Sequence, residues 1–180
     1  MASQNRNDGS GLGNYELRFG NAGQAIGEAR RRNRLFNWPI IVEGPRDRRA
    51  LVALGFVGPI EVLNRGWTIE RVVAYWYETY GTRNYATGGS SVCLLMDWDR
   101  TGGRLQRKLA NLMQGFDMMV DQDTRTVLQK NLKPETRVVE SLFGMADRLR
   151  YYINLEDRFC LLYTTPIPPN GLLSRMPSSA

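Results

Sequence analysis

The chain has 180 residues, 42% of them hydrophobic and 23% charged, which is typical of one globular domain with a core of its own. It contains no histidine, so Ser-His-Asp and Cys-His catalytic systems and histidine metal sites are excluded. Two cysteines build no disulfide framework, no apolar run reaches the roughly 20 residues of a membrane span, and the N-terminus lacks a secretory apolar segment. We therefore expect a cytoplasmic protein without a membrane partner or a disulfide-linked partner.

The net charge of +6 comes almost entirely from arginine, because only Lys108, Lys130 and Lys133 are lysines. Arginine binds phosphate through two parallel hydrogen bonds and stacks on bases, so this usage favours a nucleic-acid partner. A genome whose composition favours arginine codons is the alternative explanation.

The first 34 residues are rich in Gly, Asn and Ser and predict a basic, largely irregular N-terminal arm, with a short helix over 24–34. The arm ends in a basic cluster that either contacts nucleic-acid phosphates or is merely solvated. This cluster consists of Arg30, Arg31, Arg32 and Arg34. We expect the domain itself over 35–147, followed by the end of a last helix and a Pro-rich tail over 148–180.

Apolar periodicity then predicts strands alternating with helices. The predicted strands are 39–42, 59–63, 92–96 and 118–120, and the predicted helices are 46–54, 69–80, 104–116, 126–132 and 138–153. This order indicates an α/β fold: a compact Rossmann-like domain of about four mostly parallel strands flanked by helices. The aromatic side chains of Tyr75, Trp76 and Tyr77 are interpreted as packing residues rather than base-stacking residues.

Acidic residues follow two of these strands. Asp97 and Asp99 come directly after a run of five apolar residues and precede a glycine pair, and Glu43 follows the first strand. Ligands of open α/β sheets bind beyond the carboxyl ends of the strands, and carboxylates there suit Mg²⁺. An Asp-x-Asp pair in a solvated turn is the plain alternative.

Two segments together resemble the signatures of the Toprim domain family. Ile41-Val42-Glu43-Gly44-Pro45-Arg46-Asp47 resembles the first, in which Glu-Gly ends an apolar strand and Asp follows after two intervening residues. Leu94 to Gly102 resembles the second, Asp-x-Asp-x-x-Gly. The resemblance covers roughly 36–145. The segments Leu63 to Trp67, Asp97 to Gly103 and Val139-Glu140 look most like small stand-alone archaeal Toprim proteins and the bacterial ribonuclease that matures the smallest ribosomal RNA.

The resemblance implies a Mg²⁺-dependent site for making or breaking phosphodiester bonds. It implies Asp97 and Asp99 as catalytic metal ligands, Glu43 as general acid/base or ligand, and Asp47 as a brace of the first turn. Four arginines are expected to bind phosphates. They are Arg46, Arg65, Arg100 and Arg104.

Two functional hypotheses follow. The first is a Mg²⁺-dependent nuclease that hydrolyses structured RNA. The second is a non-catalytic RNA-binding protein, associated with ribosomal RNA or ribosomal particles. The run Asp97 to Thr101 also fits the Asp-x-Asp-x-Thr motif of haloacid-dehalogenase phosphatases, but those enzymes place the motif on their opening strand, whereas two strands precede it here.

Overall fold

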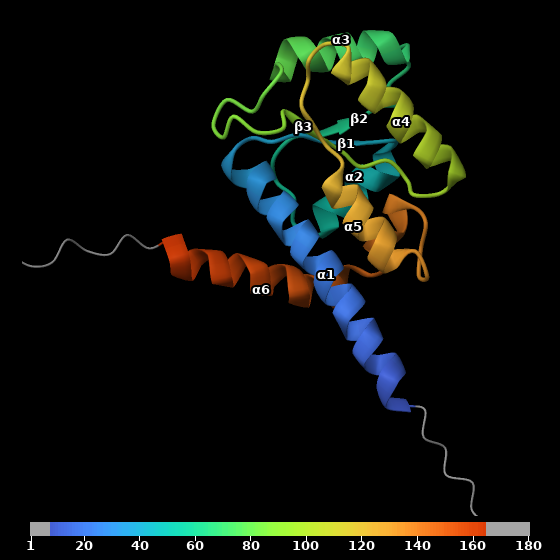
Figure 1. Ribbon diagram of the computed structural model, residues 1–180, viewed down its shortest axis with the longest axis vertical. Coiled ribbons are helices and arrows are strands. Elements are labelled where there is room, and N and C mark those ends of the chain that lie inside the picture. The colour runs from blue at the N-terminus through green and yellow to red at the C-terminus, as the bar shows by residue number, and fades with distance from the viewer. Residues whose placement is uncertain (1–7, 165–180) are drawn as a thin grey trace, which may run out of the picture.

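Four short parallel strands form the centre of the protein, with helices on both faces (Figure 1). The computed structural model describes residues 8–164, and the side chains of 13–155. The strands are β1 (Ile40–Val42), β2 (Ile60–Val62), β3 (Val92–Leu94) and β4 (Val120–Asp121), in the order β2-β1-β3-β4. All three strand pairs are parallel, which confirms the predicted α/β class and sheet.

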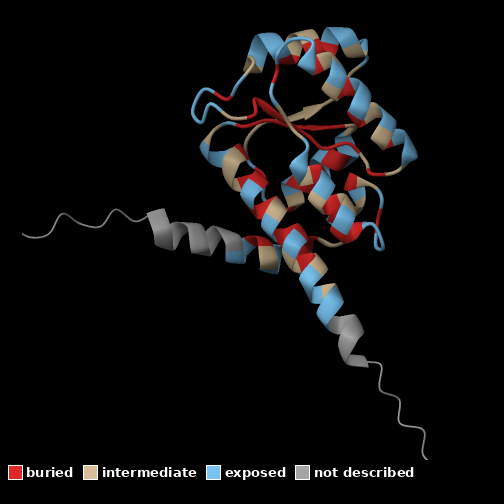
Figure 2. Ribbon diagram, viewed as in Figure 1, coloured by how far each residue is buried: buried red, intermediate tan, exposed pale blue. Residues whose placement is uncertain are grey.

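Both faces of the sheet are covered by helices, and the side chains along each strand point alternately to one face and to the other. Ile40 and Val42 of β1 and Cys93 of β3 belong to one hydrophobic cluster, whereas Ile41 and Leu94 belong to the other. This explains why the strands are continuously apolar, and Figure 2 shows β1 and β3 as buried.

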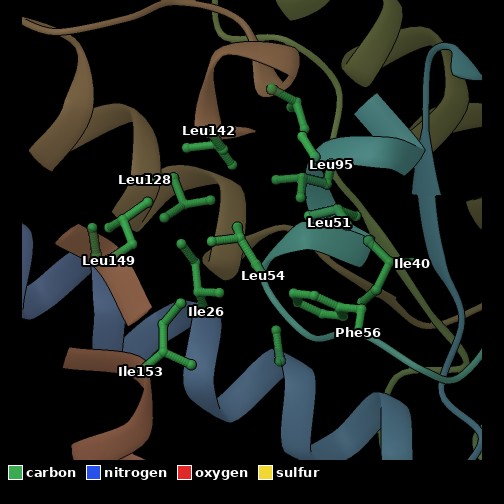
Figure 3. Packing of buried hydrophobic residues seen from close by; sticks show 14 of the residues in the cluster. Ile26, Ile40, Leu51, Leu54, Phe56, Leu95, Leu128, Leu142, Leu149 and Ile153 are labelled. Atoms are coloured by element: carbon green, nitrogen blue, oxygen red, sulfur yellow. The ribbon is translucent and has the colours of Figure 1, made fainter. Parts of the chain in front are cut away.

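Two unequal layers of helices cover these faces. One layer contains α3 (Ile69–Tyr80) and α4 (Arg100–Gln114), above the sheet in Figure 1. The other layer contains α1 (Asp8–Leu35), α2 (Pro45–Ala53), α5 (Asp123–Leu132), the 3-10 helix η1 (Val139–Phe143) and α6 (Ala146–Thr164). Figure 3 shows Ile26 of α1 and Ile153 of α6 in the same cluster as Leu51 and Leu54.

The prediction of a largely irregular N-terminal arm is wrong for the part that the structure describes, because α1 is a helix of 28 residues. Phe19 and Ile26 are buried in the core, and α1 packs against α5 and α6. Gly23 permits this packing, since a β-carbon there would overlap the side chain of Tyr152 on α6. The core therefore crosses the boundaries predicted at residues 34 and 147.

Two other boundaries differ from prediction. Helix α4 begins at Arg100, four residues earlier than expected, because Asp99 caps it. The single helix predicted over 138–153 is divided into η1 and α6, and the Pro-rich tail beyond Thr164 lies outside the described residues. Within residues 8–164, no helix is long and apolar enough to cross a membrane.

Candidate functional site

The candidate site lies where the direction of chain winding changes in the sheet. The chain passes from β1 to its neighbour β2, and then returns across β1 to place β3 on the other side. In open α/β sheets the carboxyl ends of two such strands form the ligand-binding crevice. Here Glu43 directly follows β1, and Asp97 lies three residues beyond β3.

An open groove of about 1050 Å³ lies at this position and carries both signs of charge. Its acidic residues are Glu43, Asp47, Asp97 and Glu140. Its basic residues are Arg46, Arg48 and Arg49, all from the first turns of α2. The structure thus brings the predicted residues Glu43, Asp97 and Arg46 into one groove, and adds two arginines that the sequence analysis did not single out.

Asp97 is the most strongly perturbed carboxyl group of the groove. Burial raises its pKa to about 6, and the negative charges of Asp47, Glu43 and Asp99 act in the same direction. A hydrogen bond of 2.7 Å from the backbone N–H of Val139 to Oδ1 of Asp97 opposes this shift. Asp97 is therefore held in place by η1 while its charge is disfavoured by its surroundings.

Burial and neighbouring carboxylates disfavour the charged forms of Glu43 and Asp47 as well. Burial raises the pKa of Glu43, and the charges of Asp47 and Asp99 raise it further. Burial also raises the pKa of Asp47, whose Oδ2 accepts a hydrogen bond of 2.8 Å from the N–H of Gly44. That bond fits the expectation that Asp47 braces the first turn of α2.

Asp99 does not line the groove, but it forms an acidic cluster with Glu43, Asp47 and Asp97, because its charge raises the pKa of Glu43 and of Asp97. It also caps α4. Its Oδ1 accepts a hydrogen bond of 2.7 Å from the N–H of Gly102, which is the usual role of aspartate before a helix. The N-termini of α2 and α4 thus both lie at the carboxyl edge of the sheet. Unpaired N–H groups at helix N-termini favour the binding of anions such as phosphate.

The turn after β3 is supported by side chains that the sequence analysis missed. Arg125 of α5 donates from Nε to the carbonyl of Met96 at 2.9 Å and from Nη2 to that of Asp97 at 2.7 Å. Gln106 donates to the carbonyl of Leu94 and accepts from the N–H of Met96. No local pattern reveals such partners, because each reaches the turn from another helix.

Gly102 explains why a glycine follows the acidic pair. A β-carbon at this position would overlap the backbone carbonyl of Asp97, whereas one at Gly103 would meet nothing closer than Arg125 at 3.7 Å. The first glycine of the pair therefore allows α4 to begin directly against the turn that carries Asp97.

The donor set fits Mg²⁺ in its chemistry. Within the described residues, no three acidic or thiol side chains converge on one point as a closed metal cage would require. Mg²⁺ does not need such a cage, because it keeps several waters and uses one or two carboxylates together with substrate phosphate. Asp97 and Asp99 each use one oxygen for a backbone N–H, and a carboxylate has further acceptor capacity.

The other predicted arginines lie outside the groove. Arg100 and Arg104 are exposed on α4, next to the acidic cluster in sequence. Arg65 forms an ion pair with Glu61 and is largely buried. The structure therefore does not bring these three arginines into the lining of the groove.

The basic cluster of α1 lies at the opposite edge of the sheet, where β1 and β3 begin. Arg30 is only 7% exposed and donates to the carbonyl of Leu54 and to Asn154. Arg32 lies over the ring of Trp38 at 3.6 Å and donates to Ser90. At least these two arginines therefore stabilise the contacts of α1, contrary to the expectation of an exposed basic arm.

Comparison with known proteins places the chain in a family. The UPF0292 protein of Thermococcus onnurineus is 37% identical over 112 residues, which cover 62% of this chain and 76% of that protein. This chain belongs to the UPF0292 family. The UPF0292 proteins of Pyrococcus abyssi and Methanosarcina barkeri are 34% and 32% identical, covering 70% and 62% of this chain and 83% and 71% of theirs. No family model matches the chain.

A solved structure shares the fold. A putative protein from Aquifex aeolicus superposes with a TM-score of 0.51 at 24% identity, covering 65% of this chain and 94% of that one. At this level of identity the similarity concerns the architecture alone, and it agrees with the compact Rossmann-like domain described above.

Proposed function

We propose that this protein is a Mg²⁺-dependent, Toprim-type enzyme of the cytoplasm that hydrolyses phosphodiester bonds in structured RNA. The observation that carries the proposal is the acidic cluster at the switch point, with the raised pKa values of Glu43 and Asp97, beside the arginines of α2. Such a cluster destabilises itself unless a cation neutralises it, and perturbed acids in a groove are typical of functional sites.

Asp97 and Asp99 are the residues that would hold Mg²⁺, with Glu43 as a further ligand or as the general acid/base. When bound, Mg²⁺ would polarise a phosphoryl oxygen and offset the charge that develops on it. Glu43 suits proton transfer because burial and the neighbouring carboxylates raise its pKa, which makes it a stronger base than an ordinary glutamate.

The arginines of the groove supply the contacts for the substrate backbone. Arg46 and Arg48 lie in the first turns of α2, where their charge adds to the positive end of the helix. A guanidinium group binds a phosphate through two hydrogen bonds. We infer RNA as the substrate from the resemblance to the ribonuclease that matures the smallest ribosomal RNA. The same resemblance favours ribosomal RNA or ribosomal particles as the partner.

The test is incubation of the purified protein with total cellular RNA, in Mg²⁺ or in EDTA. Asp97→Asn and Glu43→Gln are compared with wild type, and Glu78→Gln on the exposed face of α3 is the matched control. We expect discrete products only with Mg²⁺, in wild type and in the control. Cleavage that survives both groove substitutions would refute the assigned roles.

A second candidate function is RNA binding without catalysis. It is favoured by the structural use of the acidic residues, since Asp97 and Asp99 each fix a backbone N–H. In that case RNA would be retained intact under all conditions. Its affinity would fall steeply with salt, by about 0.7 log unit for each neutralised phosphate of a single strand when the salt concentration rises tenfold. Salt-insensitive retention would contradict phosphate binding.

A further inference from the structure

A patch of alternating arginine and aromatic side chains lies beside the candidate groove. We call it the Trp67 patch, and it consists of Arg65, Trp67, Arg71 and Tyr75. Trp67 lies in the turn between β2 and α3 and is 41% exposed, whereas the three other tryptophans of the chain are buried. An exposed tryptophan on a short turn contributes little to the core, so its position needs another explanation.

The rings and the guanidinium groups of the patch are already arranged for stacking. The guanidinium carbon of Arg71 lies 4.3 Å from the centre of the Trp67 ring. That of Arg65 lies 5.4 Å from the ring of Tyr75 and 5.9 Å from that of Trp67. The two aromatic rings meet edge to face at 5.8 Å. Tyr75 thus supports Trp67 from the side and leaves the indole at the surface.

Arg65 is held rigidly at the inner side of this patch. It forms an ion pair with Glu61 and donates from Nε to the carbonyl of Val62 at 2.7 Å. Glu61 in turn accepts hydrogen bonds from the indole of Trp76 and the hydroxyl of Tyr80. A charge that is fixed before binding loses little side-chain entropy when a ligand arrives.

The patch is continuous with the candidate groove. A second hollow of about 620 Å³ runs along β2 and includes Arg65 and Tyr75 in its lining. Pro45, Arg48 and Asn64 line both hollows. A nucleic-acid strand whose phosphodiester lies at Asp97 would therefore pass Arg48 and reach Tyr75, whose ring lies against that of Trp67.

We propose that the Trp67 patch is a stacking subsite for an unpaired nucleotide of the strand that occupies the candidate groove. The inference rests on the proposed function and adds that the substrate is single-stranded beside the scissile bond. A base stacks on an aromatic ring whatever its identity, and an adjacent guanidinium group adds cation–π attraction and binds phosphate. The patch therefore selects for unpaired structure rather than for sequence.

Charge complementarity favours this occupant over a protein partner. Arg71 of the patch and Arg48 at the junction supply positive charge, and the chain carries a net charge of +6. The only carboxylate of the junction hollow, among the residues that line it, is Glu61, which is already neutralised by Arg65. A single-stranded nucleic acid can bind the arginines through its phosphates and stack its bases on the aromatic rings.

The test uses the fluorescence of Trp67, since the other three indoles are buried. Hexauridylate, and a fully paired duplex of the same length, are titrated at constant salt into wild type, Trp67→Ala and Trp67→Phe. Because the two variants lack the indole, their affinities and that of wild type are also measured by fluorescence anisotropy of end-labelled oligonucleotides. Tyr85→Ala is the matched control, because Tyr85 is an exposed aromatic residue in the loop before β3, at the opposite edge of the sheet.

We expect hexauridylate to quench wild-type fluorescence, and Trp67→Ala to weaken its binding by about 10- to 100-fold. Trp67→Phe should retain most of the affinity, and Tyr85→Ala all of it, while duplex binding stays unchanged in every variant. Equal single-strand affinity in wild type and Trp67→Ala would overturn the inference, and so would an equal loss for the duplex.

Failure of the subsite and failure of the proposed function give different results. If Trp67→Ala binds hexauridylate like wild type, and wild type shows Mg²⁺-dependent cleavage, the subsite is refuted and the nuclease stands. If Asp97→Asn cleaves like wild type but Trp67→Ala loses single-strand affinity, the assigned site is refuted and the subsite stands. Absence of all single-strand binding by wild type overturns the subsite directly.

Discussion

The charge of Asp97 should destabilise the protein when no cation is present. Its pKa is raised from 3.8 to about 6 in the folded state, so the folded protein binds a proton more tightly than the unfolded chain does. The resulting stability is fully present below pH 3.8 and is lost as the pH rises through about 6. Asp97→Asn keeps a neutral oxygen that accepts from Val139 at every pH.

The size of the effect follows from the shift. A change of about two pKa units corresponds to about 3 kcal/mol, and solvent screening at a partly exposed groove reduces this to about 1–2 kcal/mol. We therefore expect Asp97→Asn in EDTA to be more stable than wild type by about 1–2 kcal/mol at pH 8. The difference should shrink as the pH falls through 6 and be largely gone at pH 4, where the folded-state carboxyl group is protonated and that of the unfolded chain is partly protonated.

Urea denaturation at pH 4, 6 and 8 measures this difference, with Glu78→Gln as a control that should match wild type throughout. Addition of Mg²⁺ should reverse the order at pH 8, because the ion stabilises only a folded state that binds it. The reasoning is refuted if Asp97→Asn is no more stable than wild type at pH 8 in EDTA, or if its advantage is the same at pH 4.

Three further substitutions test the packing around the site and around α1, each by urea denaturation. Gly102→Ala should destabilise the fold by more than about 2 kcal/mol, because the new methyl group overlaps the carbonyl of Asp97. Gly23→Ala should cost about 2 kcal/mol or more by pushing α1 away from Tyr152. Arg125→Met should cost about 1–3 kcal/mol and weaken Mg²⁺ binding, because two buried carbonyls lose their donor.

Neighbouring positions supply the controls. Gly103→Ala also lies in α4 but meets only the side chain of Arg125 at 3.7 Å, so it should leave stability unchanged or raise it by up to about 1 kcal/mol. Gly13→Ala has no neighbour within 4 Å and should act in the same way on α1. If Gly103→Ala destabilises the protein as much as Gly102→Ala, or Gly13→Ala as much as Gly23→Ala, the lost stability comes from helix backbone effects and not from the close contacts described.

The sheet and its helix ends could be predicted from sequence because their signals are local. Thr68 accepts a hydrogen bond from the N–H of Arg71 as an N-cap, and Gly81 ends α3 with a positive φ, as expected for these residue types. The convergence of Glu43 and Asp97 was equally predictable, since a parallel sheet brings the carboxyl ends of its strands to one edge.

Features that depend on distant partners were not predictable. Arg125 lies 28 residues after the carbonyl of Asp97 that it caps, and Val139 lies 42 residues after the carboxylate that its N–H binds. The short helix predicted over 24–34 lies within α1, but the earlier turns of α1 were missed because their glycines and asparagines have low helix propensity and the helix is stabilised by packing against α6. The spacing of Gly20, Gly23 and Gly27 on one face was the available signal for close helix contact.

The joining of α1 to α6 in one core sets the order in which the protein can mature on the ribosome. The larger hydrophobic cluster needs Phe19 and Ile26 from one end and Leu149 and Ile153 from the other. The smaller cluster is complete once Met118 and Val120 have been synthesised. One face of the sheet can therefore be covered early, while the other stays apolar and open until Ile153 has left the exit tunnel. During that interval the nascent chain exposes the surface that chaperones recognise and that favours aggregation.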